Sequence, residues 1–85
     1  MKLTELPNIG KTTQAQLHEV GIETAEDLFA VGSREAFLRL RTIDPGCCFS
    51  CLQGLEGAVR GVRWHALDDQ TKRGLKEFFD GVTLV

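Results

Sequence analysis

The residues LPNIGKTT at positions 6–13 decide the fold of this chain. Pro7 cannot continue a helix, because it has no N–H group and its ring clashes with the preceding turn. Asn8 and Gly10 are residue types that tolerate a positive φ. We therefore expect the chain to reverse direction between Pro7 and Gly10, and a helix to begin near Lys11.

The segment that follows has the pattern of an amphipathic helix. Its apolar stripe consists of Ala15, Leu17 and Val20. Gly21 comes directly after this stripe, where glycine often ends a helix, and Ile22 is the apolar residue that commonly folds back. A helix is therefore predicted for residues 11–20, with Thr12 or Thr13 available to cap a free N–H group.

Together with the residues after it, this stretch resembles a helix-hairpin-helix motif. The further matching residues are Leu17, Val20, Gly21, Ile22, Thr24 and Leu28. In that family, the hairpin glycines and the N-terminus of the next helix hold DNA phosphates without reading the base sequence. Free N–H groups and a partial positive charge point the same way at such a terminus. The resemblance implies a phosphate cradle formed by Ile9, Gly10, Lys11 and Thr12.

Asn8 departs from the family pattern, which usually has glycine at this position. Asparagine can hold the turn, but we expect its side chain to lie where the backbone should approach a phosphate. The alternative is a purely structural hairpin, in which Pro7–Gly10 joins two helices and Ile9 is inserted into the core. Both interpretations stay open at this point.

Composition and charge describe one globular domain covering residues 1–85. The chain is 42% hydrophobic and has a formal net charge of −2. Residues 1–31 contain two lysines against five acidic residues, so the hairpin lies in an acidic segment. A DNA-binding protein usually has a basic face. Basic residues from the middle of the chain are therefore the candidate helpers of the hairpin: Arg39, Arg41, Arg60 and Arg63.

No signal-peptide pattern and no apolar run of about 18 residues is visible. We therefore expect a cytoplasmic protein without a membrane partner. The lack of tyrosine and of any β-branched run favours an all-α chain. About five helices are expected, over residues 11–20, 24–31, 33–41, 45–60 and 69–80, after at most a short helix in residues 1–6.

Capping residues set the predicted helix boundaries. Thr24 and Ser33 are expected to cap the helices that they begin. Asp44 is expected to be an N-cap, with Pro45 at the first helical position. Gly81 is expected to close the last helix.

The predicted helix 45–60 has one apolar stripe, made of Cys48, Cys51, Leu52, Leu55 and Val59. Gly54 and Gly57 lie within the same helix, although glycine costs about 1 kcal/mol in a helix interior. We therefore expect another helix or a second copy of the chain to approach closely there. Phe29 is expected on the apolar side of its helix, and Trp64 over the edge of the core.

The whole order of these features resembles the C-terminal domain of the TfoX/Sxy proteins, which are regulators linked to natural competence. The matching features are the hairpin, the segment GIETAEDL at 21–28, the Gly-Ser start of the next helix, the helix with two glycines, Trp64-His65-x-Leu67 and Lys76-x-Phe78-Phe79. The resemblance covers nearly the whole chain and implies an all-α fold without a catalytic motif. That family usually places an N-terminal domain before this one. We expect this chain to be a free-standing version of the C-terminal domain, without that N-terminal domain.

Cys47, Cys48 and Cys51 have three alternative roles. The apolar stripe favours packing, because free cysteine behaves as a small hydrophobe. A zinc site would need a fourth ligand, for which His65 is the candidate. A redox or dimer-linking role is the alternative for Cys47. We expect no metal, no cofactor and no enzyme activity, since no nucleophile and base are arranged together.

Two classes of function follow. The first is a non-enzymatic, competence-regulator-like domain that binds DNA non-specifically through the hairpin backbone and Lys11. The second is a protein-protein interaction or homodimerisation domain, with Gly54 and Gly57 on its packing face and a structural hairpin. The acidic first segment favours the second class. The motif and the family resemblance favour the first, which is our prediction.

Overall fold

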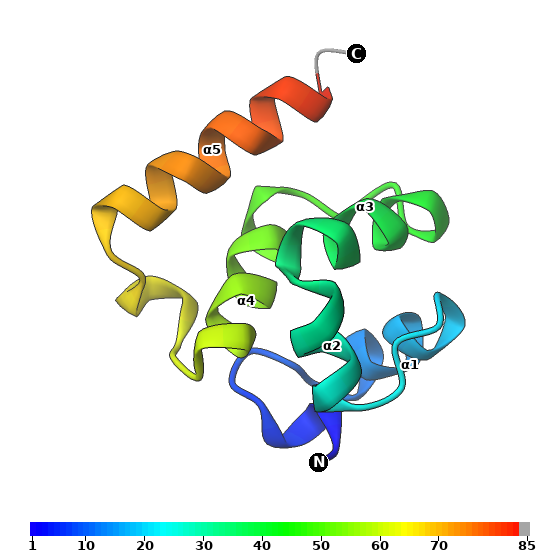
Figure 1. The fold of residues 1–85 in the computed structure, drawn as a ribbon. Helices are drawn as coiled ribbons and strands as arrows, with labels where there is room; N and C mark the ends of the chain where they lie inside the picture. The colour runs from blue at the N-terminus through cyan, green and yellow to red at the C-terminus, as the bar shows by residue number, and fades with distance from the viewer. Residues whose placement is uncertain (84–85) are drawn as a thin grey trace.

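The computed structural model describes residues 1–83 of the chain, and these residues form helices and turns without a strand (Figure 1). The prediction of an all-α fold with five helices is confirmed. The elements in order are the 3-10 turn η1 (Leu3–Glu5), α1 (Lys11–Glu19), α2 (Ala25–Val31), α3 (Ser33–Ile43), α4 (Phe49–Arg60), the 3-10 turn η2 (Trp64–Ala66) and α5 (Asp69–Thr83).

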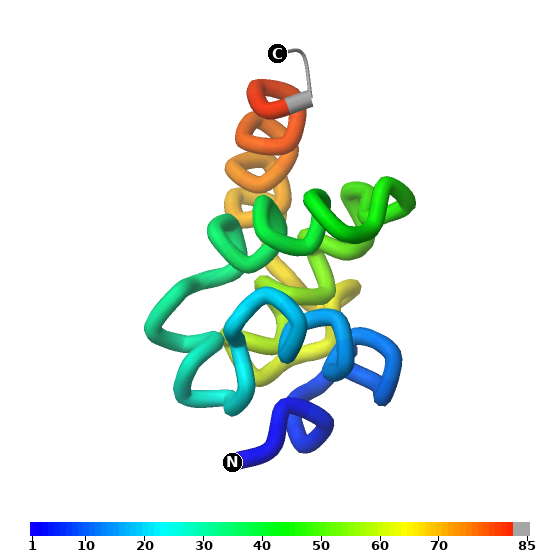
Figure 2. Tube along the Cα trace, turned by 90° about the vertical axis from the view of Figure 1, so that its right-hand side faces the viewer, coloured from blue at the N-terminus to red at the C-terminus, as the bar shows by residue number. Residues whose placement is uncertain are grey.

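Helix α4 lies at the centre of the arrangement. It packs against α3, η2 and α5, while α1 packs against η1 and α3. Figures 1 and 2 show η1, α1 and α2 at one end of the molecule and α5 leaning out at the other. The hairpin and α5 are therefore far apart, which allows variants on α5 to serve as controls for the hairpin.

The core is built from apolar side chains of all five helices, of η1 and of the loop after α1. Its largest fully buried side chains are Leu3, Leu17, Ile22, Leu28, Phe37, Leu40, Leu52, Leu55 and Leu75. Phe37 connects this core to α5, because its ring lies 6.4 Å from that of Phe78 and 5.8 Å from that of Phe79. Edge-on and tilted ring pairs at these distances attract one another beyond simple burial. Aromatic packing thus holds the leaning helix to the body.

Helix α4 begins at Phe49, so the prediction that Asp44 caps it is wrong. Asp44 is instead the C-cap of α3. One of its carboxylate oxygens accepts a hydrogen bond from the Gly46 N–H at 2.9 Å, and the other accepts one from Gln16 at 3.1 Å. Asp44 thus closes a local turn and bonds to α1, four positions before the N-cap of α4 at Cys48. Cys48 becomes the N-cap and is exposed, so its predicted place on the buried stripe is also wrong.

Other boundaries shift for similar local reasons. Helix α5 continues through Gly81 to Thr83, where the prediction ended it at Gly81. The Val82 side chain packs against the core, and its carbonyl oxygen accepts a hydrogen bond from Arg41 at 3.4 Å. These two contacts stabilise the helical conformation beyond Gly81. The side chains of Phe29 and Trp64 are 45% and 48% exposed, so neither packs as predicted.

Ser33 does not cap α3 as predicted, because Gly32 occupies the N-cap position. The Ser33 hydroxyl instead donates a hydrogen bond to buried Glu56 of α4. Arg60, one turn further along α4, donates to the other carboxylate oxygen. This arrangement joins α3 to α4 and satisfies a carboxylate that would otherwise be costly to bury.

Replacing Glu56 with glutamine is expected to reduce the loss of unfolding free energy that occurs when the pH is lowered. Burial alone would raise the pKa of Glu56, but the hydrogen bonds from Ser33 and Arg60 outweigh it and hold the pKa below its usual value. Such a group stabilises the fold above its unfolded pKa of about 4.3. That contribution is lost as the pH falls through the folded-state value.

Urea unfolding at about pH 7 and about pH 3 measures this effect as the loss of unfolding free energy on acidification. Glu56→Gln should lose less than the wild type. Glu77→Gln, on the exposed face of α5, should behave like the wild type. Equal losses in all three proteins would contradict the role given to Glu56.

Candidate nucleic-acid interface

The hairpin reverses the chain where the sequence predicted it. Asn8 adopts a φ of 69° and is the one described non-glycine residue with a positive value. Gly10 keeps an extended conformation, with a φ of −98°, and is the N-cap of α1. Ile9 between them is buried, whereas Gly10 is exposed. The hairpin therefore anchors itself in the core through Ile9 while its backbone at Gly10 faces solvent.

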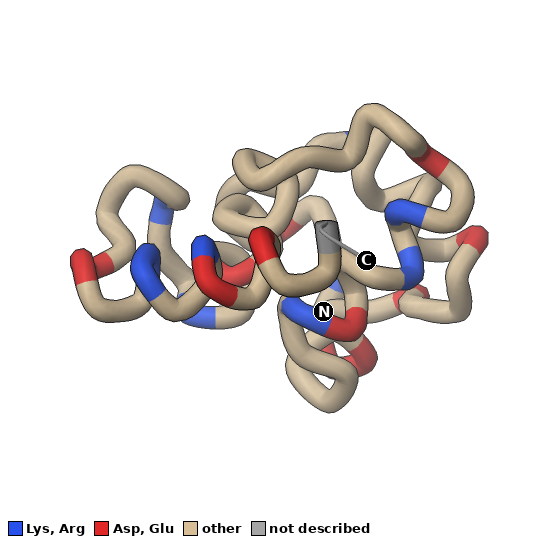
Figure 3. The backbone as a smooth tube through the Cα atoms, turned by 90° about the horizontal axis from the view of Figure 1, so that it is seen from above, with Lys and Arg blue, Asp and Glu red and all other residues tan. Residues whose placement is uncertain are grey.

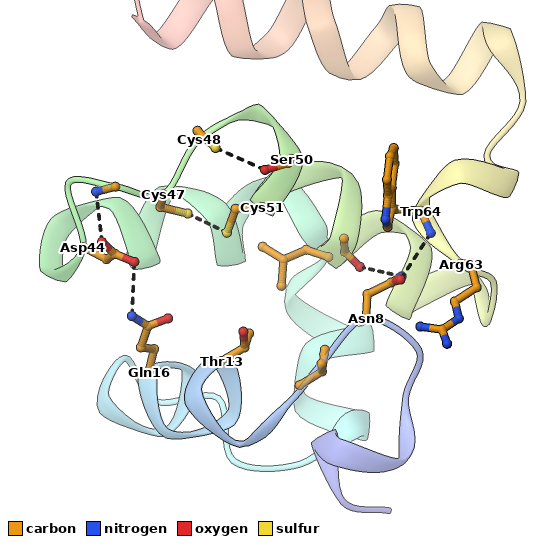
Figure 4. A pocket seen from close by; sticks show the side chains of 14 residues that line it. Asn8, Thr13, Gln16, Asp44, Cys47, Cys48, Ser50, Cys51, Arg63 and Trp64 are labelled. Carbon is orange, nitrogen blue, oxygen red and sulfur yellow. Dashed lines mark hydrogen bonds between the residues drawn. The ribbon is translucent and has the colours of Figure 1, made fainter.

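The Asn8 side chain joins the hairpin to α4 and to the loop that follows α4. Its amide nitrogen donates to the carbonyl oxygens of Gly54 at 3.3 Å and Val62 at 3.0 Å. Its carbonyl oxygen accepts from the Trp64 N–H at 3.2 Å (Figure 4). The expectation that this side chain would stand in the path of a phosphate is therefore wrong. It points into the protein, where it gives a partner to the Val62 carbonyl oxygen and the Trp64 N–H of the loop after α4.

Asn8 also explains one of the two glycines of α4, Gly57. A Cβ atom at Gly57 would lie 2.5 Å from the Asn8 amide nitrogen and 2.6 Å from the Val62 carbonyl oxygen. At Gly54 it would lie 3.6 Å from the Asn8 Cβ, an ordinary contact. The predicted close approach is real, but it comes from a side chain and a loop of the same chain. The expectation that another helix approaches Gly57 is wrong, because Asn8 and the Val62 backbone occupy that position.

The N-terminus of α1 is open to solvent beside this anchored turn. Gly10, Lys11 and Thr12 are exposed, and no side chain within the described residues caps the helix. Thr12 and Thr13 lie inside the first turn, so the prediction that one of them caps it is wrong. The first N–H group with an acceptor in the helix is that of Gln14, which donates to the Gly10 carbonyl oxygen at 3.0 Å. The amides before it are the groups that an anion could use.

The predicted basic helpers divide into one at the hairpin and three elsewhere. Arg63 is exposed and lines a hollow of about 710 Å³ together with Pro7 and Gly10. Arg39 pairs with Glu35 at 2.9 Å and also donates to the Val20 carbonyl oxygen at 3.2 Å, at the opposite end of α1.

Arg41 and Arg60 are likewise occupied within the fold. Arg41 lies over the Phe37 ring, 5.5 Å from its centroid, and bonds the backbone of α5. Arg60 pairs with Glu56. The structure thus brings Gly10 and Arg63 to one hollow, with exposed Lys11 and Thr12 following in the first turn of α1, whereas Ile9 is buried.

The charge around this surface is mixed. Glu5 lines the same hollow as Arg63. Figure 3 shows lysine and arginine interspersed with aspartate and glutamate along the chain, without a single basic face. Acidic groups within about 8–10 Å weaken the attraction for a phosphate at physiological salt. Any binding here is expected to be weak and strongly dependent on salt.

A cavity of about 460 Å³ lies between the hairpin and the cysteine-containing loop. Asn8 and Trp64 line one side, and Cys47 and Cys51 line the other (Figure 4). Sequence reasoning missed the connection of Asn8 to Val62 and Trp64, which lie more than fifty positions away. The one available signal was Gly57, whose position in a helix interior indicated a close approach.

Metal-binding clusters and membrane-spanning helices are both absent from the described residues. Across residues 1–83, no group of three or more His, Cys, Asp or Glu side chains is placed to hold a metal ion. In the same part of the chain, no helix is both long and apolar enough to cross a membrane.

Comparison with known proteins agrees with this architecture. The Protein Sxy of Escherichia coli (strain K12) is 34% identical over 82 residues, which cover 96% of this chain and 39% of Sxy. An uncharacterised Listeria monocytogenes protein, solved in a triclinic crystal form, is 48% identical with a TM-score of 0.94, covering 98% of this chain and 94% of that one.

A Listeria monocytogenes protein of unknown function, solved in a tetragonal form, is 49% identical with a TM-score of 0.91, covering 95% of this chain and 99% of that one. The family model of the TfoX C-terminal domain matches residues 1–79. This match and the identity to Sxy confirm the resemblance seen in the sequence: the chain belongs to the TfoX C-terminal domain family.

Proposed function

We propose that this domain acts in competence-type regulation by binding the phosphate backbone of DNA non-specifically through its hairpin. The observation that carries the proposal is the uncapped, exposed N-terminus of α1 at Gly10–Thr12, with Arg63 lining a hollow beside Gly10. Helix N-termini with free amides are favourable sites for phosphate groups. The proposal places the domain in the cytoplasm, where DNA lies in the bacteria from which its relatives come.

Each contact in this proposal has a distinct role. The amides of Lys11 and Thr12 would donate to phosphate oxygens, and the side chains of Lys11 and Arg63 would neutralise the charge. Asn8 would hold the hairpin in place without touching DNA. Two or three neutralised phosphates predict a slope of about −2 to −3 when the logarithm of the association constant is plotted against the logarithm of salt concentration.

Replacing Lys11 with glutamate is expected to reduce DNA affinity about tenfold at low salt and to make the salt slope shallower by about 1. The change puts a negative charge at the proposed phosphate site. Fluorescence anisotropy of a labelled duplex at two salt concentrations measures both quantities. Arg73→Glu on α5 is the matched control, because it changes the net charge equally at an exposed position far from the hairpin.

Equal losses in the Lys11 and Arg73 variants would show that net charge alone governs binding. No binding by the wild type at low salt and high protein concentration would contradict the DNA proposal. The interaction-domain alternative, with a protein partner or a homodimer, would then be tested by sedimentation and partner capture. Gly57 would not form its interface, since Asn8 and the Val62–Trp64 backbone already occupy that face, whereas half-buried Gly54 stays a candidate.

A further inference from the structure

The three cysteines are placed in three different ways at the start of α4. Cys47 precedes the helix, Cys48 is its N-cap, and Cys51 lies in its first turn. The sulfur atoms of Cys47 and Cys51 are 2.6 Å apart and both side chains are partly buried. The corresponding distance in a disulfide is about 2.05 Å. These two thiols are therefore closer than sulfur atoms in ordinary van der Waals contact.

The turn before α4 produces this proximity. Within a helix, side chains four positions apart have Cβ atoms about 5–6 Å apart, too far for a sulfur–sulfur bond. Cys47 lies outside the helix, because its N–H donates to the Asp44 carbonyl oxygen at 3.0 Å and so closes a turn. The Gly46 N–H donates to the Asp44 carboxylate at 2.9 Å and tightens the same turn. Cys47 is thus folded back over the first turn of α4.

Cys48 takes no part in this pair. Its sulfur lies 3.1 Å from the Ser50 hydroxyl, and Figure 4 shows it on the other side of the loop from the facing sulfurs of Cys47 and Cys51. The Cys-x-x-Cys spacing of Cys48 and Cys51 would, on sequence alone, nominate those two residues. The structure instead places Cys47 beside Cys51.

We propose that Cys47 and Cys51 are a redox modification site that forms a reversible intramolecular disulfide on exposure to a peroxide. The Cys51 thiolate attacks one oxygen of hydrogen peroxide, giving a sulfenic acid and hydroxide, which takes up a proton to become water. The Cys47 thiol then attacks the Cys51 sulfur to form the S–S bond, and its proton goes to the departing hydroxide, so that the second oxygen leaves as water. Two thiols are oxidised by two electrons, and one peroxide is reduced to two water molecules.

The local environment supports this order of attack. The Cys47 thiol donates its hydrogen to the Cys51 sulfur, which lowers the pKa of Cys51 and raises that of Cys47. Because the thiolate is the reactive form, Cys51 is the first nucleophile. Both sulfurs line the cavity of about 460 Å³, which gives a small oxidant a route to them.

Three single substitutions separate the pairings, because each leaves two cysteines. Cys48→Ser leaves Cys47 with Cys51, Cys47→Ser leaves Cys48 with Cys51, and Cys51→Ser leaves Cys47 with Cys48. Each protein is treated with hydrogen peroxide, the remaining thiols are alkylated, and intact mass is followed with time. Circular dichroism of the reduced variants confirms that each is folded before treatment.

Cys48→Ser should form an intramolecular disulfide at the wild-type rate and revert with dithiothreitol. Cys47→Ser should form one about tenfold more slowly or worse, because its two sulfurs are not held together. Cys51→Ser should form none. Equal rates in the Cys48 and Cys47 variants, or failure of Cys48→Ser to lose two thiols, would overturn the proposal.

Discussion

Phe37→Ala is expected to lower the free energy of unfolding by about 3–5 kcal/mol. The Phe37 side chain is fully buried and contacts Phe78 and Phe79 of α5, with the Arg41 guanidinium over its ring. Alanine would leave a cavity at the point where α5 joins the body. Urea unfolding followed by circular dichroism measures the loss, and hydrogen exchange should show α5 amides opening before those of α4.

Phe29→Ala is the matched control for this substitution. The Phe29 side chain is 45% exposed on α2, so its removal leaves no closed cavity. We expect it to change the unfolding free energy by less than about 1 kcal/mol. Similar losses in the two variants would contradict the assignment of Phe37 as the residue that joins α5 to the core.

Gly57→Ala is expected to lower the free energy of unfolding by about 2–4 kcal/mol, although alanine favours helix by about 1 kcal/mol. The new methyl group would collide with the Asn8 amide and with the Val62 carbonyl oxygen, at 2.5 and 2.6 Å. The Val62 backbone cannot move away without disturbing the loop, so the hydrogen bond between the Asn8 amide and the Val62 carbonyl oxygen would break. Chemical denaturation measures the effect.

Gly54→Ala, on the same helix, provides the comparison. Its methyl group would only touch the Asn8 Cβ at 3.6 Å. The helix preference of alanine should therefore leave stability unchanged or raise it by up to about 1 kcal/mol. If Gly57→Ala were as stable as Gly54→Ala, the close contact between the hairpin and α4 would be disproved.

The helices could be predicted from sequence because their signals are local. The positive φ at Asn8, the start of α1 at Lys11 and the capping box of Thr24 with Asp27 each depend on neighbours within a few positions. The predicted start of α4 was wrong, because Asp44 instead accepts a local bond from Gly46 and a distant one from Gln16 of a different helix. No local pattern encodes the distant contact.

In the candidate site, too, the features set by local sequence could be predicted and those set by distant contacts could not. Gly10, Lys11 and Thr12 were predicted together because they are adjacent in the sequence. Arg39 and Arg63 looked equivalent as basic residues of the middle segment. Arg39, however, pairs with Glu35 of its own helix and bonds to Val20 at the end of α1, whereas Arg63 reaches the hairpin. That difference depends on how the loop after α4 packs against Asn8, which no local pattern encodes.

The most direct test of the central claim is the amide spectrum of the ¹⁵N-labelled domain titrated with a short DNA duplex. We expect the largest shifts at the amides of Gly10, Lys11 and Thr12, with a smaller change at Arg63 and none along α5, and we expect all of them to shrink as salt is added. No shift at Gly10–Thr12 in excess duplex, or larger shifts on α5 than at the hairpin, would contradict the account.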